Sequence, residues 1–327
     1  MDVFRFLDLL TGYQPAMAII AARHLGLFDA LTATAQPVGS LAAALDGDEA
    51  TLAALLRALA ALGLVAEGAA GYSITDFAAD HLVGDRDLAL VIDKEEYFAR
   101  AWLALDDVVR TGNPVLEPWR TRLNADPSTA AMFLDALNVL AEHTGPAVWD
   151  LPELASADRI LDVGGGFGFY AHRLAAAGAT VLLVDLPEVI DAMAHRLDVT
   201  GLVARGAIEL IAADVMAAPS GGVGPASVDA ALVSHMLHDV SEADGIELLR
   251  RVAAAVRPGG AVVVNDFAGD FGPGAFGPMF DVMMRVETGG AAYPRATLEA
   301  MLAEAGLREI RVASFPEPQT VLIGRVA

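Results

Sequence analysis

Cysteine is absent from the 327 residues, so the chain has no disulfide and no thiolate ligand for a metal. Basic residues are scarce, since 21 Lys and Arg stand against 43 Asp and Glu and leave a net charge of −22. This excess of negative charge repels nucleic-acid phosphates and anionic lipids. The two deficits exclude a disulfide scaffold, argue against nucleic acid or a membrane surface as partner, and favour a small molecule.

Long uncharged apolar runs are also missing. No window reaches the roughly 18 residues of a membrane-spanning helix, and residues 1–5 do not begin the basic segment and long apolar core of a secretion signal. We therefore expect a cytoplasmic protein. Hydrophobic residues still make up 55% of the chain, which is enough for a large core, and the length indicates about two domains.

The first hundred residues predict a helical module with a short hairpin. Apolar spacing predicts one long helix over 13–31, a short helix ending at Leu45 and a third helix that Asp48 caps, followed by a hairpin around residues 65–75. This order is typical of a winged helix. The third helix carries only Arg57 as a base, so we reject DNA binding and expect a packing or dimerisation role, with the apolar residues at 4–10 docking on a second subunit.

Residues 159–168, Arg-Ile-Leu-Asp-Val-Gly-Gly-Gly-Phe-Gly, describe a strand, a tight turn and the start of a helix. Glycine suits such a turn because it adopts positive φ and lets the backbone lie against a ligand. The N–H groups of the helix start are then free to bind it. The segment predicts a nucleotide-binding crossing.

Two cofactor classes use such a turn. Gly166, Gly168 and Ala171 fit the glycine pattern of dinucleotide binders. Asp162, Gly164, Gly166 and Gly168 fit a competing pattern in which an acid ends the strand. A carboxylate is badly placed beside a pyrophosphate but well placed beside the ammonium group of S-adenosylmethionine (SAM), so we favour SAM.

Three successive predicted strands each end in an aspartate, which would place the three acids at one edge of a sheet. After Asp162, the strand at 179–185 ends in Asp185 about 20 residues beyond Gly164, where a carboxylate takes ribose hydroxyls, and the strand at 208–215 ends in Asp214-Val215. Asp185 does not distinguish the two cofactors, because NAD and SAM both need an acid for the ribose. A nucleoside lying across the carboxyl ends of the strands accounts for all three together.

The rest of the chain alternates strands and helices from Ser156 onward, which predicts a parallel sheet covered on both faces. A fourth strand, 228–234, runs directly into His235 and His238, so both histidines are expected at the ligand edge. Two further strands, 308–313 and 320–325, are expected to close the sheet as an antiparallel pair. Helices are also predicted over 93–110 and from Pro127 to about Gly145.

The motifs fall in the order seen in the SAM-dependent small-molecule O-methyltransferases of the acetylserotonin and caffeate type, which this chain resembles over nearly its whole length. They are Asp162–Gly168, Val184–Pro187, Ala213–Val215, Leu237–Asp239, Arg257–Gly260 and Thr288–Gly290. The resemblance implies an α/β fold: a class I methyltransferase Rossmann-like sheet (101–327) with an N-terminal all-α winged-helix dimerisation domain (1–100). It also implies a homodimer that methylates a hydroxyl, expected to be phenolic, of a small natural product.

The resemblance assigns roles residue by residue. His238 is the expected general base and Asp266 the acid that orients it. The cofactor residues are Asp162, Gly164, Gly166, Asp185, Leu186, Asp214, Val215 and Ser234. The expected acceptor pocket contains Phe133, Leu137, His235, Phe267, Met279 and Met283.

The chain also departs from the family pattern. Ala292 stands where plant members often carry a second acid, and His235 where they often carry tryptophan. The weakened acid set leaves C- or N-methylation open, as well as a relative that has lost methyl transfer and acts as a decarboxylase, hydroxylase or cyclase. His235, His238 and Asp239 are compatible with metal ligation, but no third spaced histidine follows and we expect no metal.

Overall fold

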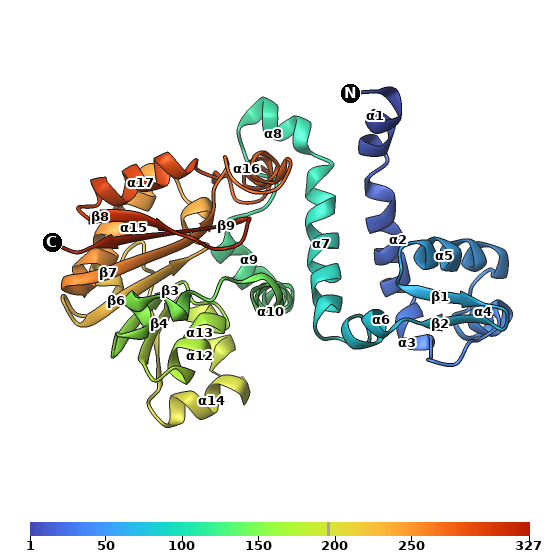
Figure 1. Ribbon diagram of the computed structural model, residues 1–327, viewed down its shortest axis with the longest axis horizontal. Coiled ribbons are helices and arrows are strands. Elements are labelled where there is room, and N and C mark those ends of the chain that lie inside the picture. Colours follow the sequence, from blue (N-terminus) through green and yellow to red (C-terminus); the bar gives the residue numbers. More distant parts are fainter. Residues whose placement is uncertain (195–196) are drawn as a thin grey trace. The chain divides into compact units, whose positions relative to one another are not determined.

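The computed structural model describes residues 1–194 and 197–327, without the side chains of residues 197–200, and its elements are shown in Figure 1. The chain divides into two compact units, Met1–Tyr97 and Phe98–Ala327. No helix in this described part of the chain combines the length and the hydropathy needed to cross a bilayer.

The first unit is mainly helical. Its elements are α1 (Val3–Leu10), α2 (Tyr13–His24), α3 (Leu27–Ala30), α4 (Val38–Ala44), α5 (Glu49–Ala61), β1 (Val65–Gly68), β2 (Gly71–Ile74) and α6 (Asp76–His81). Asp48 caps α5 by accepting the Thr51 N–H at 2.8 Å, and β1 and β2 form the expected antiparallel hairpin. The prediction of one helix over 13–31 is wrong, because Gly26 turns left-handed at φ 67° and separates α2 from α3.

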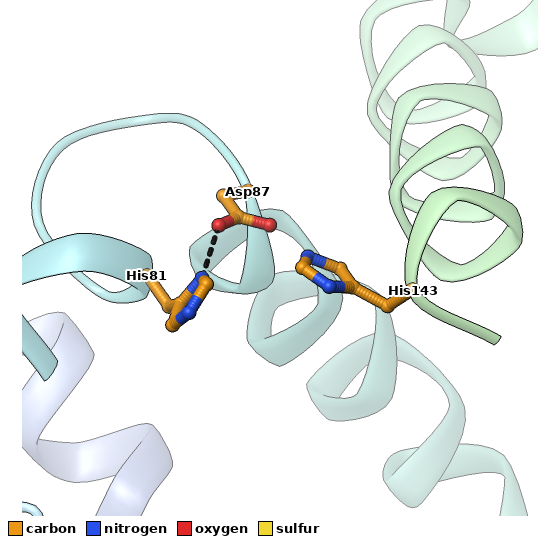
Figure 2. A group of neighbouring side chains, drawn as sticks. All are labelled: His81, Asp87 and His143. Carbon is orange, nitrogen blue, oxygen red and sulfur yellow. Dashed lines mark hydrogen bonds and ion pairs between the residues drawn. The ribbon is translucent and has the colours of Figure 1, made fainter. Parts of the chain in front are cut away.

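A local bond stabilises the end of this unit. Figure 2 shows His81, the last residue of α6, with its Nδ1 2.5 Å from Oδ2 of Asp87 in the turn that follows. Figure 2 also labels His143, which belongs to the other unit, on α10 (Pro127–Thr144). The pair joins the end of α6 to the residue just before α7 (Leu88–Trp102).

The segment before the sheet is helical as well. The helix expected over 93–110 is two helices, α7 and α8 (Leu105–Thr111), and Gly112 at φ 71° ends the second. A short helix that the sequence did not predict, α9 (Trp119–Ala125), follows. The expected start of α10 at Pro127 is confirmed, and Asp126 caps it by accepting the backbone N–H groups of Ser128 and Thr129.

Seven strands form the sheet of the second unit, in the order β5-β4-β3-β6-β7-β9-β8. They are β3 (Arg159–Val163), β4 (Thr180–Asp185), β5 (Ile208–Ala212), β6 (Val228–Ser234), β7 (Val256–Phe267), β8 (Arg308–Ala313) and β9 (Gln319–Arg325). The first five pair in parallel, and β9 pairs antiparallel with both β7 and β8. The parallel sheet and its antiparallel closing pair are therefore confirmed.

Helices cover both faces of this sheet (Figure 1). The connections are α11 (Pro152–Ala155), α12 (Phe169–Ala176), α13 (Pro187–Met193), α14 (Leu197–Ala204), α15 (Glu242–Ala255), α16 (Phe276–Glu287) and α17 (Arg295–Glu304), with short 3-10 turns η1 (Val148–Asp150), η2 (Pro219–Gly222) and η3 (Leu237–Asp239). Ile160 packs in the core under α12, whereas Leu161 and Val163 pack in the core under α15 and α17. This alternation along β3 is what a strand buried on both faces requires.

The strand order creates a switch point. From β3 the chain moves outward through β4 to β5, and it then returns to β6 on the other side of β3 and continues to β7. Ligands of open α/β sheets bind at such a reversal, outside the carboxyl ends of the strands. The candidate site is therefore sought at the ends of β3 to β7.

Candidate active site

The glycine turn after β3 has the backbone that the sequence predicts. Gly164, Gly166 and Gly168 all adopt positive φ, at 65°, 53° and 87°. Gly168 is the N-cap of α12, and the Gly164 N–H donates to the carbonyl of Val184 at 2.8 Å. A side chain on Gly165 would meet the Asp162 carboxylate at 2.9 Å, so this turn keeps its backbone close to that acid.

Asp162 is a buried acid with one oxygen that lacks a hydrogen-bond partner in the described part of the chain. Its side chain is 1% exposed, and its Oδ2 has no hydrogen-bond partner within the described residues. Burial, reinforced by the charge of Asp185, raises the pKa of Asp162 to about 7. A ligand that brings a cation or a hydrogen-bond donor to Oδ2 would stabilise a buried carboxylate in this state.

The other two acids lie at the same edge. Asp185 ends β4 and accepts the N–H groups of Gly166 at 2.8 Å and Leu186 at 2.7 Å, although burial still raises its pKa. Asp214 lies two residues beyond β5, so the expectation that this strand runs to 215 is wrong. It accepts the Met216 N–H at 2.9 Å and an N–H of Arg120 on α9 at 3.0 Å.

The remaining expected cofactor residues also follow the ends of strands. Leu186 is the N-cap of α13, Val215 is buried next to Asp214, and Ser234 is the last residue of β6. The edge thus presents three carboxylates, a glycine turn and a helix N-terminus together. Such a donor set fits a ligand with a positive centre, a ribose and a base better than it fits a pyrophosphate.

His238 and Asp266 form a buried pair at the next two strands. His238 is in η3 after β6, Asp266 is near the end of β7, and His238 Nδ1 lies 2.5 Å from Asp266 Oδ1. Asp266 is 1% exposed and also accepts the Phe267 N–H at 2.8 Å. The bond from Nδ1 leaves Nε2 of His238 as the nitrogen that can accept a proton from a ligand.

Charges around the imidazole make it a strong base. Burial disfavours the imidazolium, but the carboxylates of Asp266, Asp239 and Glu287 outweigh it and raise the pKa of His238 to about 9. Burial also opposes ionisation of Asp266, yet His238 lowers the pKa of that acid. The pair is therefore an ion pair at neutral pH.

Aromatic rings surround the pair. Phe280 of α16 lies edge-on to His238 with ring centroids 5.1 Å apart, and Phe267 lies 4.7 Å from His235 and 5.0 Å from Phe280. Phe276 packs on Phe267 and stacks on Phe280, and Met283 packs against the same cluster. This is an apolar wall next to a polar pair, as small-molecule sites usually are.

Not all expected acceptor residues join this wall. His235, Phe267 and Met283 do, whereas Leu137 and Met279 are exposed and Phe133 packs on Phe98 and Trp119. Phe276, Phe280, Glu287 and Asn265 also lie around this pair, and the sequence interpretation gave none of them an individual role. Their helical spacing was the available signal for the three on α16, because Phe276, Phe280 and Glu287 recur every three to four residues or a multiple of this.

A metal is a separate question at this site. One donor atom from each of His235, His238 and Asp266 lies within 4.8 Å of the other two. His238 and Asp266 already bond to each other, and we assign no metal to them.

Comparison with known proteins identifies the chain. Residues 105–308 match an O-methyltransferase domain and residues 7–84 match an O-methyltransferase dimerisation domain. Together with the sheet order and the ligand edge, this defines a class I methyltransferase. The chain belongs to the O-methyltransferase family, and it is an enzyme of the SAM-dependent methyltransferase type.

Individual relatives cover nearly the whole chain. A 3-hydroxy-5-methyl-1-naphthoate 3-O-methyltransferase of Streptomyces sahachiroi is 30% identical over 95% of this chain and 91% of that protein. An O-demethylpuromycin-O-methyltransferase of Streptomyces alboniger is 28% identical over 95% of this chain and 85% of that protein. The solved structure of PigF with SAH superposes with a TM-score of 0.87 at 23% identity, covering all of both chains, and so supports the fold.

Proposed function

We propose that the protein transfers the methyl group of SAM to an aromatic hydroxyl of a small natural product, with His238 as the general base. The observation that carries this proposal is the buried His238–Asp266 pair, which lies at the same sheet edge as the three aspartates. The Streptomyces relatives, whose names give naphthoate and puromycin-type acceptors, support this acceptor class.

Asp162, Asp185 and Asp214 would hold the cofactor, with Gly164, Gly166, Leu186, Val215 and Ser234 around it. The unpartnered Oδ2 of Asp162 suits the ammonium group, and Asp185 at the end of β4 suits the ribose hydroxyls. When bound, SAM supplies the electrophilic methyl group. The protein's own task is then to place the acceptor oxygen in line with that methyl and to manage its proton.

The raised pKa of His238 reduces the cost of removing that proton. A phenol with pKa about 10 facing an ordinary imidazole of pKa about 6.5 is uphill by about 5 kcal/mol, whereas against a pKa of about 9 the cost falls to about 1.4 kcal/mol. The opposing effect is that only about one ring in a hundred is neutral at pH 7. Asp266 stabilises the imidazolium that forms, as the acid of a hydrogen-bonded pair does.

We also propose that the protein is a homodimer, with residues 1–100 as the dimerisation domain and 101–327 as the catalytic domain. Helix α1 supports this, because none of its residues is buried within the chain. Its exposed apolar side chains are Val3, Phe4, Phe6, Leu7, Leu9 and Leu10. A patch of this kind marks an interaction surface.

Calorimetry with SAM and with NAD tests the cofactor, and a panel of aromatic hydroxyl compounds with SAM labelled with ¹³C in its methyl group tests the reaction. The chemical shift of the transferred carbon distinguishes an O-methyl from an N-methyl or C-methyl product. We expect SAM binding without NAD binding, and O-methyl products. NAD binding without SAM binding, or C-methyl products only, would contradict the proposal.

A further inference from the structure

Asn265 is a polar residue in the middle of an apolar strand. It lies in β7 between Val264 and Asp266, and its side chain is fully buried. Its Nδ2 lies 3.1 Å from the Tyr170 hydroxyl, 3.0 Å from Ser234 Oγ and 3.3 Å from His235 Nε2. Burying an amide is costly unless its polar atoms find partners. Nδ2 of Asn265 has these three neighbours, whereas its Oδ1 has none within the described residues.

The backbone of His235 is held in an unfavourable conformation. Its φ is 53°, in the left-handed region that residues other than glycine rarely adopt. The His235 N–H donates to the carbonyl of Asn265 at 2.8 Å, so the same residue holds both the backbone and the ring. Strain of this kind persists where the surrounding structure fixes a side chain for use.

The amide of Asn265 selects the tautomer of His235. The amide N–H₂ has two hydrogens for its three neighbours, and in this orientation it can only donate to His235 Nε2. The tautomer compatible with such a bond carries the proton of the neutral ring on Nδ1. Burial lowers the pKa of His235 to about 4, although Asp266 opposes this, so the ring is neutral at any ordinary working pH. Nδ1 has no hydrogen-bond partner within the described residues and is not fully buried, so its N–H is available to a ligand.

The His235 ring lies beside the His238–Asp266 pair and the aromatic wall. The His235 ring lies 5.9 Å from the His238 ring and 4.7 Å from Phe267, centroid to centroid. A neutral donor therefore stands next to the base, within the span of one fused aromatic ring system. The carboxylates of Asp239, Asp266 and Glu287 around His238 disfavour an anionic group at the same place.

We infer that His235 is a specificity residue that donates its Nδ1–H to an uncharged oxygen of the acceptor, so that the preferred substrates are aromatic hydroxyl compounds that also carry a carbonyl. This inference rests on the proposed methyl transfer for its substrate and on Asn265 for its geometry. A carbonyl oxygen is the natural partner because it accepts without adding charge to an already acidic site.

The first test compares two acceptors in wild-type protein and in His235→Phe, which keeps a ring on Phe267 but removes the N–H. One acceptor is umbelliferone, a hydroxycoumarin with a ring carbonyl, and the other is 2-naphthol, which is also a fused two-ring hydroxyl compound but has no carbonyl. We expect the KM for umbelliferone to rise about 10-fold more than the KM for 2-naphthol, because only umbelliferone loses a hydrogen bond. Equal changes for the two acceptors, or no change for either, would overturn the inference.

The matched control is His172→Phe, a histidine exposed on α12, which should change neither value. Each acceptor is compared with itself across variants, so the different acidities of the two hydroxyls cancel.

The second test does not depend on turnover. Nitrogen NMR of histidine-labelled protein, with the His235 signals assigned by their loss in His235→Phe, should show a protonated Nδ1 and an unprotonated Nε2. Asn265→Leu should abolish this preference. A proton on Nε2 in the wild-type protein would overturn the inference, while a protein that shows the expected tautomer but methylates no acceptor would instead contradict the proposed function.

Discussion

The ligand edge, at the carboxyl ends of strands β3 to β7, has two halves with different charge balance. At the ends of β3 and β4, Asp162 is buried with an unpartnered oxygen, and the charge of Asp185 makes its ionisation harder. At the ends of β6 and β7, His238 and Asp266 neutralise each other across 2.5 Å. Under the proposed function the first half takes its positive charge from the cofactor, whereas the second carries its own counter-charge.

The two halves also lose stability over different pH ranges. The folded pKa of Asp162 is above its unfolded value, so the protein binds an extra proton when folded and loses stability as pH rises from about 4 to about 7. The pKa of His238 is raised from 6.5 to about 9, so its contribution is complete below about 6.5 and is lost as pH rises through about 9. Both groups therefore make the folded, ligand-free protein more stable at lower pH.

Replacing the base should have the largest effect. In His238→Gln the proton of the acceptor hydroxyl has no group to go to, so kcat should fall by about 10²–10⁴. SAM affinity, measured by calorimetry, should stay within about threefold, because His238 belongs to the acceptor half. His172→Gln, on the exposed face of α12, is the control. Unchanged turnover in His238→Gln would remove the proposed base.

Removing the counter-charge should have the next largest effect. In Asp266→Asn the imidazolium loses its charged partner, and kcat at pH 9 should fall by about 10–100-fold, since a bond to a charged group is worth about 1.5–3 kcal/mol. The pKa of His238 should fall too, so the rate at pH 6 should suffer less than the rate at pH 9. A loss of equal size at both pH values would show that Asp266 acts only through packing.

Asp162→Asn tests the other half of the comparison. The neutral amide should weaken SAM binding by about 10–100-fold for the same electrostatic reason, while the melting temperature of the free protein at pH 8 should not fall and should tend to rise. The exposed Asp158, just before β3, provides the control Asp158→Asn. Lower stability without a change in SAM affinity would mean that Asp162 is structural.

Much of this arrangement follows from sequence. The parallel order, the glycine turn and the acids at strand ends could be predicted because each is a local pattern, a strand followed by residues that must lie at its carboxyl edge. The end of β5 before Asp214 could not, because tertiary packing decides where a continuous pattern stops. The break at Gly26 did have a local signal, since an isolated glycine in a helical pattern can end a helix, but the apolar spacing on both sides of it concealed that signal.

The missed site residues come from α16 and from the interior of β7. Phe280 and Glu287 belong to a helix that follows the sheet edge, and periodicity alone does not say which core residue touches a ligand. Asn265 stands next to three valines in β7, and only the three-dimensional structure shows its contacts with Tyr170, Ser234 and His235. Local patterns thus predict the edge, and packing determines the layer of residues behind it.

Glu287 is a further buried carboxylate in the half of the edge that contains His238, and its replacement should have the smallest effect of the changes considered. Ala292 provides no acid where plant relatives often have one, but Glu287 lies on the buried face of α16 with Phe280 and Met284, and it is only 5% exposed. The Ala291 N–H, four residues on, donates to the His238 carbonyl at 2.9 Å, which keeps this segment beside His238. Glu287 therefore adds negative charge to the acceptor half from within the chain.

In Glu287→Gln the pKa of His238 should fall, because one of the carboxylates that raise it is neutralised while Asp266 and Asp239 remain, with His235 neutral beside them. The lower limb of the kcat/KM profile against pH, which reports the free enzyme, should then move to lower pH by less than about one unit. Glu299→Gln on the exposed face of α17 should leave the profile in place. If the limb stays fixed and only the melting temperature changes, the carboxylate of Glu287 stabilises the helix packing and the base is tuned by Asp266 and Asp239 alone.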